Sequence, residues 1–203
     1  MKPFTFATGM YASGDWESGQ MVAAIVIDSL ARFTTLDLAP AGVNVALESS
    51  ELLEFPFVYL TGHLPVRFTA GERRNLSRFV ERGGFVFMDD HNHDVDGIFH
   101  KTATEELTHL FGPLRPVPND HALYRAFFTF EDGPPATSHE LNGWGDNLVH
   151  EHLLGIMRDG RIDVLYSNKD YSSEWSMHPD SKRFLEKDPS RFGVNIVVYA
   201  LTR

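Results

Sequence analysis

Two apolar runs on either side of one amphipathic helix constrain the fold of this 203-residue chain more than any other feature. Residues 57–60 (FVYL) and 84–88 (GFVFM) have the composition of parallel strands buried on both faces. Between them, Thr69 and Glu72 form a capping-box pattern, apolar residues follow at helical spacing, and a glycine pair ends the helix. This order of elements predicts a right-handed, parallel βαβ unit.

The βαβ unit also predicts where a functional site would lie. The carboxyl ends of its two strands emerge at the same edge of the sheet, and open α/β sheets bind ligands outside such ends. His63 follows the first strand, and the polar run 89–96 (DDHNHDVD) follows the second. We therefore expect the imidazole of His63 and the carboxylates of Asp89 and Asp90 to face one cavity.

The rest of the chain shows further strand and helix patterns. The Asp159-Gly160 pair is a strong hairpin signal, so the strands on either side of it should be antiparallel. Residues 113–152 have few periodic signals and are expected to form an irregular excursion within one domain spanning residues 1–203. Strands are predicted at 3–11, 43–47, 153–157 and 162–166, and helices at 17–33, at 95–111 and from Pro189 onward.

These elements predict an α/β fold with a mostly parallel central sheet, a later antiparallel hairpin and helices on both faces. For the segment from Pro189 onward, a strand stays an alternative to the helix, because Val194, Ile196 and Val197 are β-branched. No internal repeat or low-complexity segment is present.

Composition excludes several classes of function. The chain has no cysteine, which rules out a disulfide, a thiolate zinc site, an iron–sulfur cluster and a cysteine nucleophile. A formal net charge of -10 argues against nucleic acid and anionic lipid as partners. No glycine-rich phosphate-binding motif occurs, so a nucleotide cofactor is not expected.

Localisation and membrane insertion follow from the apolar segments. No apolar stretch reaches the roughly 20 residues of a membrane helix, so membrane insertion is not expected. The amino terminus, MKPFTFATGM, lacks a hydrophobic signal core. Cytoplasm and, if a signal was removed, periplasm both stay open.

The DDHNHDVD run is the strongest candidate for chemistry. It places four carboxylates and two imidazoles in eight residues, and these groups are ligands for zinc, manganese or iron. We predict Asp90, His91 and His93 as metal ligands and Asp89 as a proton-transfer group. The competing interpretation is that Asp89 or Asp90 caps the next helix while the histidines lie in solvent.

Other residues could contribute to the same site. His63 is a predicted ligand if the strand ends meet, and otherwise a turn residue. His150 and His152 would face one way in an extended segment and could add two ligands, with Glu151 as a proton-transfer group. A catalytic serine triad around Ser167 and Asp170 is not supported, because the sequence has no G-x-S-x-G motif. Predicted ligand-binding residues are Asp15, Trp16 and Gly62.

Several sequence blocks together resemble the bacterial domain-of-unknown-function family 4159. They are GDW after the first strand, FPFVYLTGH, the helix with its flanking strand (FTAGERRNLSRFVERGGFVFMDD), DGRIDVLYS and GVNIVVYALT. The strand-TGH-helix-GG-strand core is also similar to trehalose-utilisation (ThuA-like) proteins and class I glutamine amidotransferase-like domains. This resemblance implies a flavodoxin-like three-layer sandwich. At the position of the amidotransferase cysteine the chain has Asp89, Asp90 or His91, so thioester chemistry is excluded.

Three functions are compatible with these observations. The first is a divalent-metal-dependent hydrolase acting on a small polar substrate, in which a metal-bound water attacks the substrate. The second is a non-catalytic domain that keeps an amidotransferase-like pocket for a small polar ligand or a partner protein. The third is a redox protein holding iron or copper at the same ligands. The oligomeric state is not determined by the sequence.

Overall fold

The protein is described here from a computed structural model, which places residues 2–176 and 187–203. Its centre is a seven-stranded sheet with the order β2-β1-β3-β4-β7-β6-β5. Strands β2, β1, β3, β4 and β7 are mutually parallel. Strand β6 pairs antiparallel with β7, and β5 pairs antiparallel with β6. The strands are β1 (Ala7–Met10), β2 (Val43–Ala46), β3 (Phe57–Gly62), β4 (Phe85–Asp90), β5 (Arg115–Pro116), β6 (Leu154–Arg158) and β7 (Arg161–Ser167).

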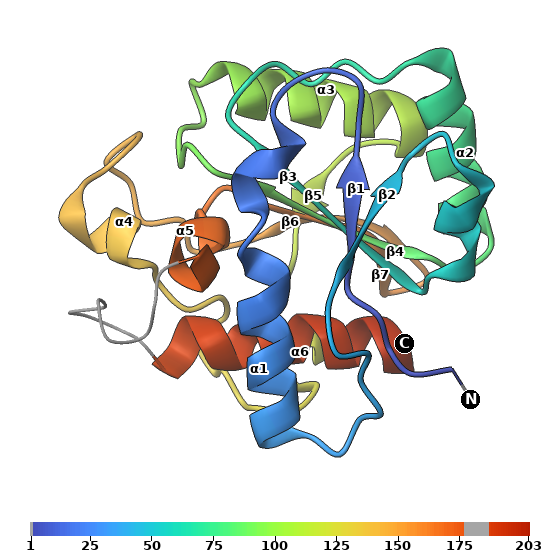
Figure 1. The fold of residues 1–203 in the computed structure, drawn as a ribbon. Helices are drawn as coiled ribbons and strands as arrows, with labels where there is room; N and C mark the ends of the chain where they lie inside the picture. The colour runs from blue at the N-terminus through green and yellow to red at the C-terminus, as the bar shows by residue number, and fades with distance from the viewer. Residues whose placement is uncertain (1, 177–186) are drawn as a thin grey trace.

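Helices cover both faces of this sheet, which makes three layers (Figure 1). Helices α2 and α3 pack on one face, while α1, α5 and α6 pack on the other. The helices are α1 (Val22–Phe33), α2 (Ala70–Glu81), α3 (Ile98–Phe111), α4 (Ser138–Asn142), α5 (Tyr171–Ser176) and α6 (Lys187–Thr202), with 3-10 turns at Trp16–Gly19, Ser50–Glu54 and Ala122–Arg125. The predicted α/β class is confirmed, and the layering is consistent with a flavodoxin-like sandwich.

The predicted βαβ unit forms with the expected register. Every residue of β3 pairs in parallel with one of β4, and the last pairs are Thr61 with Asp89 and Gly62 with Asp90. Both strands are buried along their whole length, which explains their unbroken apolar sequence. The Thr69 capping box is present at the start of α2. Beyond the unit, the Asp159-Gly160 turn has positive φ at both residues, as a tight hairpin requires.

The structure corrects three of the expected boundaries. The first strand is shorter than 3–11, because only residues 7–10 pair along β2. The helix expected at 17–33 divides at Gly19, where a Cβ would lie 2.5 Å from the Thr61 side chain, so the backbone must approach β3 closely. Strand β4 continues through Asp89 and Asp90, which the sequence placed in a loop.

The carboxyl-terminal segment is a helix, so the alternative of a strand is wrong. Phe192, Ile196 and Val197 in α6 are buried in the core shared with α1, and burial of one helical face outweighs the β propensity of its residues. The 113–152 excursion contains β5, a 3-10 turn and α4, and it carries part of the candidate site described below. Within the described ranges, no helix is both long and apolar enough to cross a bilayer.

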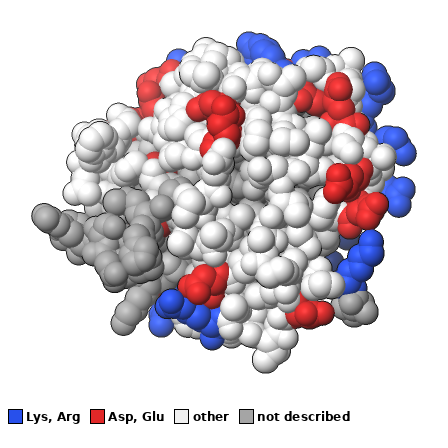
Figure 2. All heavy atoms as spheres, viewed as in Figure 1, with Lys and Arg blue, Asp and Glu red and all other residues white. Residues whose placement is uncertain are grey.

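Charge is scattered over the face seen in Figure 2. Lysine and arginine side chains lie mainly around its periphery, interspersed with aspartate and glutamate, and they form no continuous basic patch on this face.

Candidate functional site

The carboxyl ends of β3, β4 and β7 lie side by side and carry most of the candidate residues. Asp89, near the end of β4, pairs with Thr61 of β3 on one side and with Ser167 of β7 on the other. The loops that follow these strands are joined by the segment 137–150 of the excursion. Its Thr137 hydroxyl donates to the Lys169 carbonyl at 2.7 Å, just after β7. Segments far apart in sequence therefore meet at this edge.

His63 is held at this edge by Asp15. Its Nδ1 lies 2.7 Å from Asp15 Oδ2, while Asp15 Oδ1 accepts from the backbone N–H groups of His63 and Leu64. Burial opposes ionisation of this carboxyl, but the two backbone hydrogen bonds prevail and lower the pKa of Asp15. Gly62 is required for this approach, because a Cβ there would lie 2.8 Å from Asp15 Oδ1 and 2.5 Å from the Tyr11 hydroxyl.

His91 links the ends of β3 and β7. Its ring stacks on that of His63 with centroids 4.3 Å apart, and its Nε2 lies 3.1 Å from Ser173 Oγ. The same Nε2 is 3.7 Å from Oδ1 of Asp170, whose other oxygen contacts Nδ1 of His139. Burial lowers the pKa of His91, whereas the hydrogen bond that His139 donates to Asp170 raises the pKa of His139.

The paired aspartates at the end of β4 point to opposite faces of the sheet. Asp89 lies under α5, is fully buried and accepts from the Ser172 N–H at 2.7 Å. Burial, reinforced by the charge of Asp170, raises the pKa of Asp89 to about 8. Asp90 accepts from the Asn92 N–H at 2.9 Å, and burial raises its pKa to about 7. The predicted helix-capping role is not seen, because Gly97 is the N-cap of α3.

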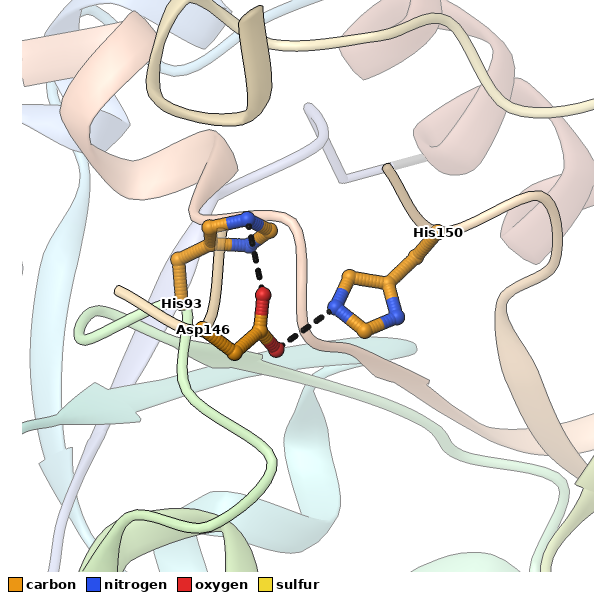
Figure 3. A group of neighbouring side chains, drawn as sticks. All are labelled: His93, Asp146 and His150. Atoms are coloured by element: carbon orange, nitrogen blue, oxygen red, sulfur yellow. Dashed lines mark hydrogen bonds and ion pairs between the residues drawn. The ribbon is translucent and has the colours of Figure 1, made fainter. Parts of the chain in front are cut away.

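His93, Asp146 and His150 form a separate group of metal-ligating type (Figure 3). One nitrogen or oxygen from each lies within 4.8 Å of the others. His93 Nε2 is 3.4 Å from Asp146 Oδ1, and His150 Nε2 is 2.9 Å from Asp146 Oδ2. His93 is fully buried, and its Nδ1 donates to the Asn168 carbonyl. Within the described part of the chain, this is the only such group of three.

The loop that carries Asp146 and His150 is shaped by glycine and by a buried ion pair. Gly143, Gly145 and Asn147 all have positive φ, so the chain turns sharply around Asp146. The Lys169 ammonium donates to Glu140 Oε1 at 2.6 Å and to the His150 carbonyl at 2.7 Å. Lys169 thereby fastens this loop to the end of β7.

We expect Gly145→Ala to displace this loop from His93. At φ +64 a Cβ on residue 145 would lie 1.8 Å from the His93 carbonyl oxygen, which is backbone and cannot move aside. The variant should lower the free energy of unfolding by more than 2 kcal/mol, beyond the roughly 1–2 kcal/mol of left-handed strain alone. Urea denaturation measures this.

Gly160→Ala is the matched control for this variant. Gly160 has φ +75 and nothing within 4 Å of its Cβ position, so it reports the conformational cost alone. Equal losses of stability in the two variants would show that residue 145 does not pack on His93.

The structure brings together only part of the predicted metal-ligand set. His93 and His150 share one group, which Asp146 completes, whereas His63, Asp90, His91 and His152 lie outside it. His152 bonds instead to Asn119 Oδ1 at 2.8 Å, and Glu151 is exposed. Trp16 packs against the core beneath α2 and α3.

Sequence reasoning missed Asp146, His139, Lys169 and Ser173. The one local signal for Asp146 was its spacing of four residues from His150, within a glycine-rich turn. His139 and Ser173 had no such signal, because each becomes part of the site only through Asp170 or His91.

Comparison with known proteins identifies the family but no activity. No curated protein matches this sequence, and the likeness to ThuA-like and amidotransferase-like proteins stays a prediction. A family model described as "Domain of unknown function (DUF4159)" matches residues 5–201, so the chain belongs to that family.

Proposed function

We propose that this protein binds a divalent transition metal through His93, Asp146 and His150, and that it is a hydrolase acting on a small polar substrate at the carboxyl ends of the strands. The observation that carries the metal site is the convergence of two imidazoles and one carboxylate within 4.8 Å. Two histidines and a carboxylate are a ligand set used by catalytic zinc sites, which keep a further position for water. Manganese and iron are also compatible with these donors.

The surroundings of the three side chains support this assignment. The Nδ1–H of His93 donates to the Asn168 carbonyl, and such a bond leaves Nε2 as the ligand nitrogen. Asp146 accepts from the backbone N–H groups of Leu148 and Val95, which orients its carboxylate. A bound metal would lower the pKa of a water molecule and polarise a carbonyl group.

A competing arrangement of His93 exists without metal. Its Nε2 lies 3.0 Å from the Leu148 carbonyl, and if both ring nitrogens are protonated each can donate to a carbonyl oxygen. Metal binding requires a deprotonated Nε2, so the two states exclude one another. The metal content of the protein distinguishes them.

The decisive measurement is metal analysis of full-length protein purified without a histidine tag. We expect one equivalent of zinc, manganese or iron, and we expect zinc added to chelator-treated protein to raise the melting temperature. Zinc at 100 times its Kd should stabilise the native state by about 2.7 kcal/mol. His93→Gln and Asp146→Asn should abolish both effects, the latter with its backbone hydrogen bonds retained.

His152→Gln is the control, because its imidazole lies outside the group. Zinc binding that survives His93→Gln and Asp146→Asn, or thermal stability that zinc leaves unchanged, would contradict the site. Stoichiometric iron or copper that undergoes reversible reduction would favour the redox function instead.

One observation favours a non-catalytic binding domain as a second candidate. Four large apolar side chains are more than half exposed on the loop around Asp146, namely Leu141, Trp144, Leu148 and Val149. Exposed apolar clusters are typical of surfaces that bind a partner protein or ligand. Metal-free protein without hydrolytic activity would favour this candidate.

A further inference from the structure

Two histidines at the strand ends share one arrangement. A carboxylate holds Nδ1 of each ring, Asp15 for His63 and Asp170 for His139. Neither Nε2 has a hydrogen-bond partner among the described residues, and the two side chains are 41% and 31% exposed. A carboxylate at Nδ1 fixes the tautomer and the ring orientation, so that Nε2 is the nitrogen that accepts or donates a proton.

The two rings belong to one continuous set of contacts. His63 stacks on His91 at 4.3 Å, and His91 Nε2 is 3.7 Å from Asp170 Oδ1. The other oxygen of Asp170 contacts His139. His63 is therefore linked to His91 directly and His139 is linked to it through Asp170, near the ends of β3, β4 and β7.

Both carboxylates are fixed by several hydrogen bonds. Asp15 accepts two backbone N–H groups as well as the imidazole. Asp170 is fully buried, has φ +56, and accepts from Ser172 Oγ at 2.8 Å and from the Ser173 N–H at 3.0 Å. A non-glycine residue in this backbone region stores strain that the surrounding structure must offset, and such strain is concentrated at functional sites.

The charged neighbours of His139 and His63 also differ. His139 faces the carboxylates of Asp170 and Glu174, and its pKa is raised, first by its hydrogen bond to Asp170. His63 faces Asp15 and the ring of His91. The hydrogen bond to Asp170 thus favours a proton on His139 that it can donate, whereas the Asp15 carboxylate at Nδ1 of His63 leaves Nε2 of that ring as the acceptor.

We propose that His63 and His139 are a general base and a general acid that hydrolyse an uncharged ester bearing an apolar group. Asp15 and Asp170 are positioning residues. This inference rests on the hydrolytic part of the proposed function and narrows its substrate to a small molecule in which the polar group is an ester and the acyl chain is apolar. It does not depend on the metal at His93, Asp146 and His150.

The proton transfers balance in a single hydrolytic cycle. His63 Nε2 takes a proton from water while the water oxygen bonds to the ester carbonyl carbon. The carbon–oxygen bond to the alcohol then breaks, and His139 Nε2–H gives its proton to the leaving oxygen. One ester and one water become one carboxylic acid and one alcohol. Exchange with solvent removes the proton from His63 and returns one to His139.

Charge and apolar surface determine the class of substrate. The carboxylates of Asp15 and Asp170 would repel a phosphate or sulfate ester. Two exposed apolar side chains lie beside the proposed pair. Leu64 follows His63 and is 51% exposed, while Trp144 is 64% exposed and stacks on the His139 ring at 5.9 Å. An uncharged ester with an apolar acyl chain matches both features.

The test uses the 203-residue chain and ethyl butyrate, whose alkoxide leaving group requires a proton, with and without prior chelation, and follows the released acid by titration. Positioned acid and base groups each contribute roughly 100-fold or more, so His63→Gln and His139→Gln should each lower kcat/KM by about that factor. His109→Gln, an exposed histidine at the end of α3, is the matched control and should leave kcat/KM unchanged. The double variant H63Q/H139Q sets the background rate.

A second readout does not depend on turnover. Nitrogen-15 NMR of the histidine rings should show neutral His63 protonated at Nδ1 in the wild type. In Asp15→Asn the proton should move to Nε2, and kcat should fall with little change in KM. A merely structural role of Asp15 would leave the tautomer unchanged.

The outcomes separate this inference from the metal proposal. Hydrolysis that survives chelation but is lost in His63→Gln and His139→Gln supports the pair, whatever the metal content. Wild-type hydrolysis no faster than that of the double variant overturns the pair, even if one equivalent of metal is bound. Single variants within threefold of wild type, or His63 protonated at Nε2, also overturn it.

Discussion

Replacing Lys169 with methionine is expected to lower the free energy of unfolding by about 3–5 kcal/mol, because it leaves a buried carboxylate without its counter-ion. The side chains of Lys169 and Glu140 are 1% and 0% exposed, and their charged atoms lie 2.6 Å apart. Burial lowers the pKa of Lys169, which reflects the cost of removing the ammonium from water, and Glu140 opposes that shift. Chemical denaturation of wild type and variant measures the difference.

Loss of this ion pair should also weaken metal binding. Lys169 donates to the His150 carbonyl, and Glu140 accepts from the His150 N–H, so the pair fixes the backbone of a proposed ligand. We expect the zinc affinity of Lys169→Met to fall at least tenfold in calorimetric titration, although none of the three proposed ligands is changed.

Two further variants test whether the unpaired charge of Glu140 causes the loss of stability in Lys169→Met. Lys101→Met breaks an exposed ion pair with Asp96 and should cost less than 1 kcal/mol. The double variant K169M/E140Q should recover much of the lost stability, since the uncompensated charge is gone. A loss in Lys169→Met no larger than that in Lys101→Met would show that the pair is not buried.

Relative to wild type, Asp89→Asn is expected to gain a few kcal/mol more stability at pH 8.5 than at pH 5. The pKa of Asp89 is raised to about 8 in the folded protein, against roughly 3.9 in the unfolded chain. The native state therefore binds more protons between these values, and stability falls as pH rises from about 4 to about 8. An amide has no charge to desolvate and can still accept from the Ser172 N–H.

Thermal denaturation at several pH values measures this effect. In the wild type, Asp90 adds to the same trend, because burial raises its pKa to about 7. Asp28→Asn, which alters an exposed carboxylate, is the control and should leave the pH profile unchanged. If Asp89→Asn lowers stability equally at pH 5 and pH 8.5, then Asp89 is ionised in the fold and its charge is stabilising.

The two proposed sites at this edge of the sheet share the 137–150 segment. It carries Asp146 and His150 of the metal group and His139 of the acid–base pair, while His93, His63 and Asp170 come from the loops that follow β4, β3 and β7. Both include residues from the excursion, which contributes Asp146, His150 and His139. The part of the chain with the weakest periodicity therefore contributes much of the candidate chemistry.

Local periodicity was sufficient to predict the central architecture. The apolar runs of β3 and β4, the Thr69 capping box and the glycine pair after α2 each have a local physical cause, and together they imply the parallel pairing of Thr61 with Asp89. The Asp159-Gly160 hairpin was predictable for the same reason, because its backbone conformation depends on two adjacent residues. Only burial of α6 against α1 decided between helix and strand for the last segment.

What the sequence by itself determined is the α/β fold and the edge at which polar side chains gather, since both follow from patterns within single elements. The tertiary structure alone decided which side chains meet there. It joined Asp146 to His93 and Asp170 to His139, and it turned His63 toward Asp15 and away from the metal group. Such contacts span up to 53 residues, depend on loop conformation and a buried ion pair, and have no periodic signature in the chain.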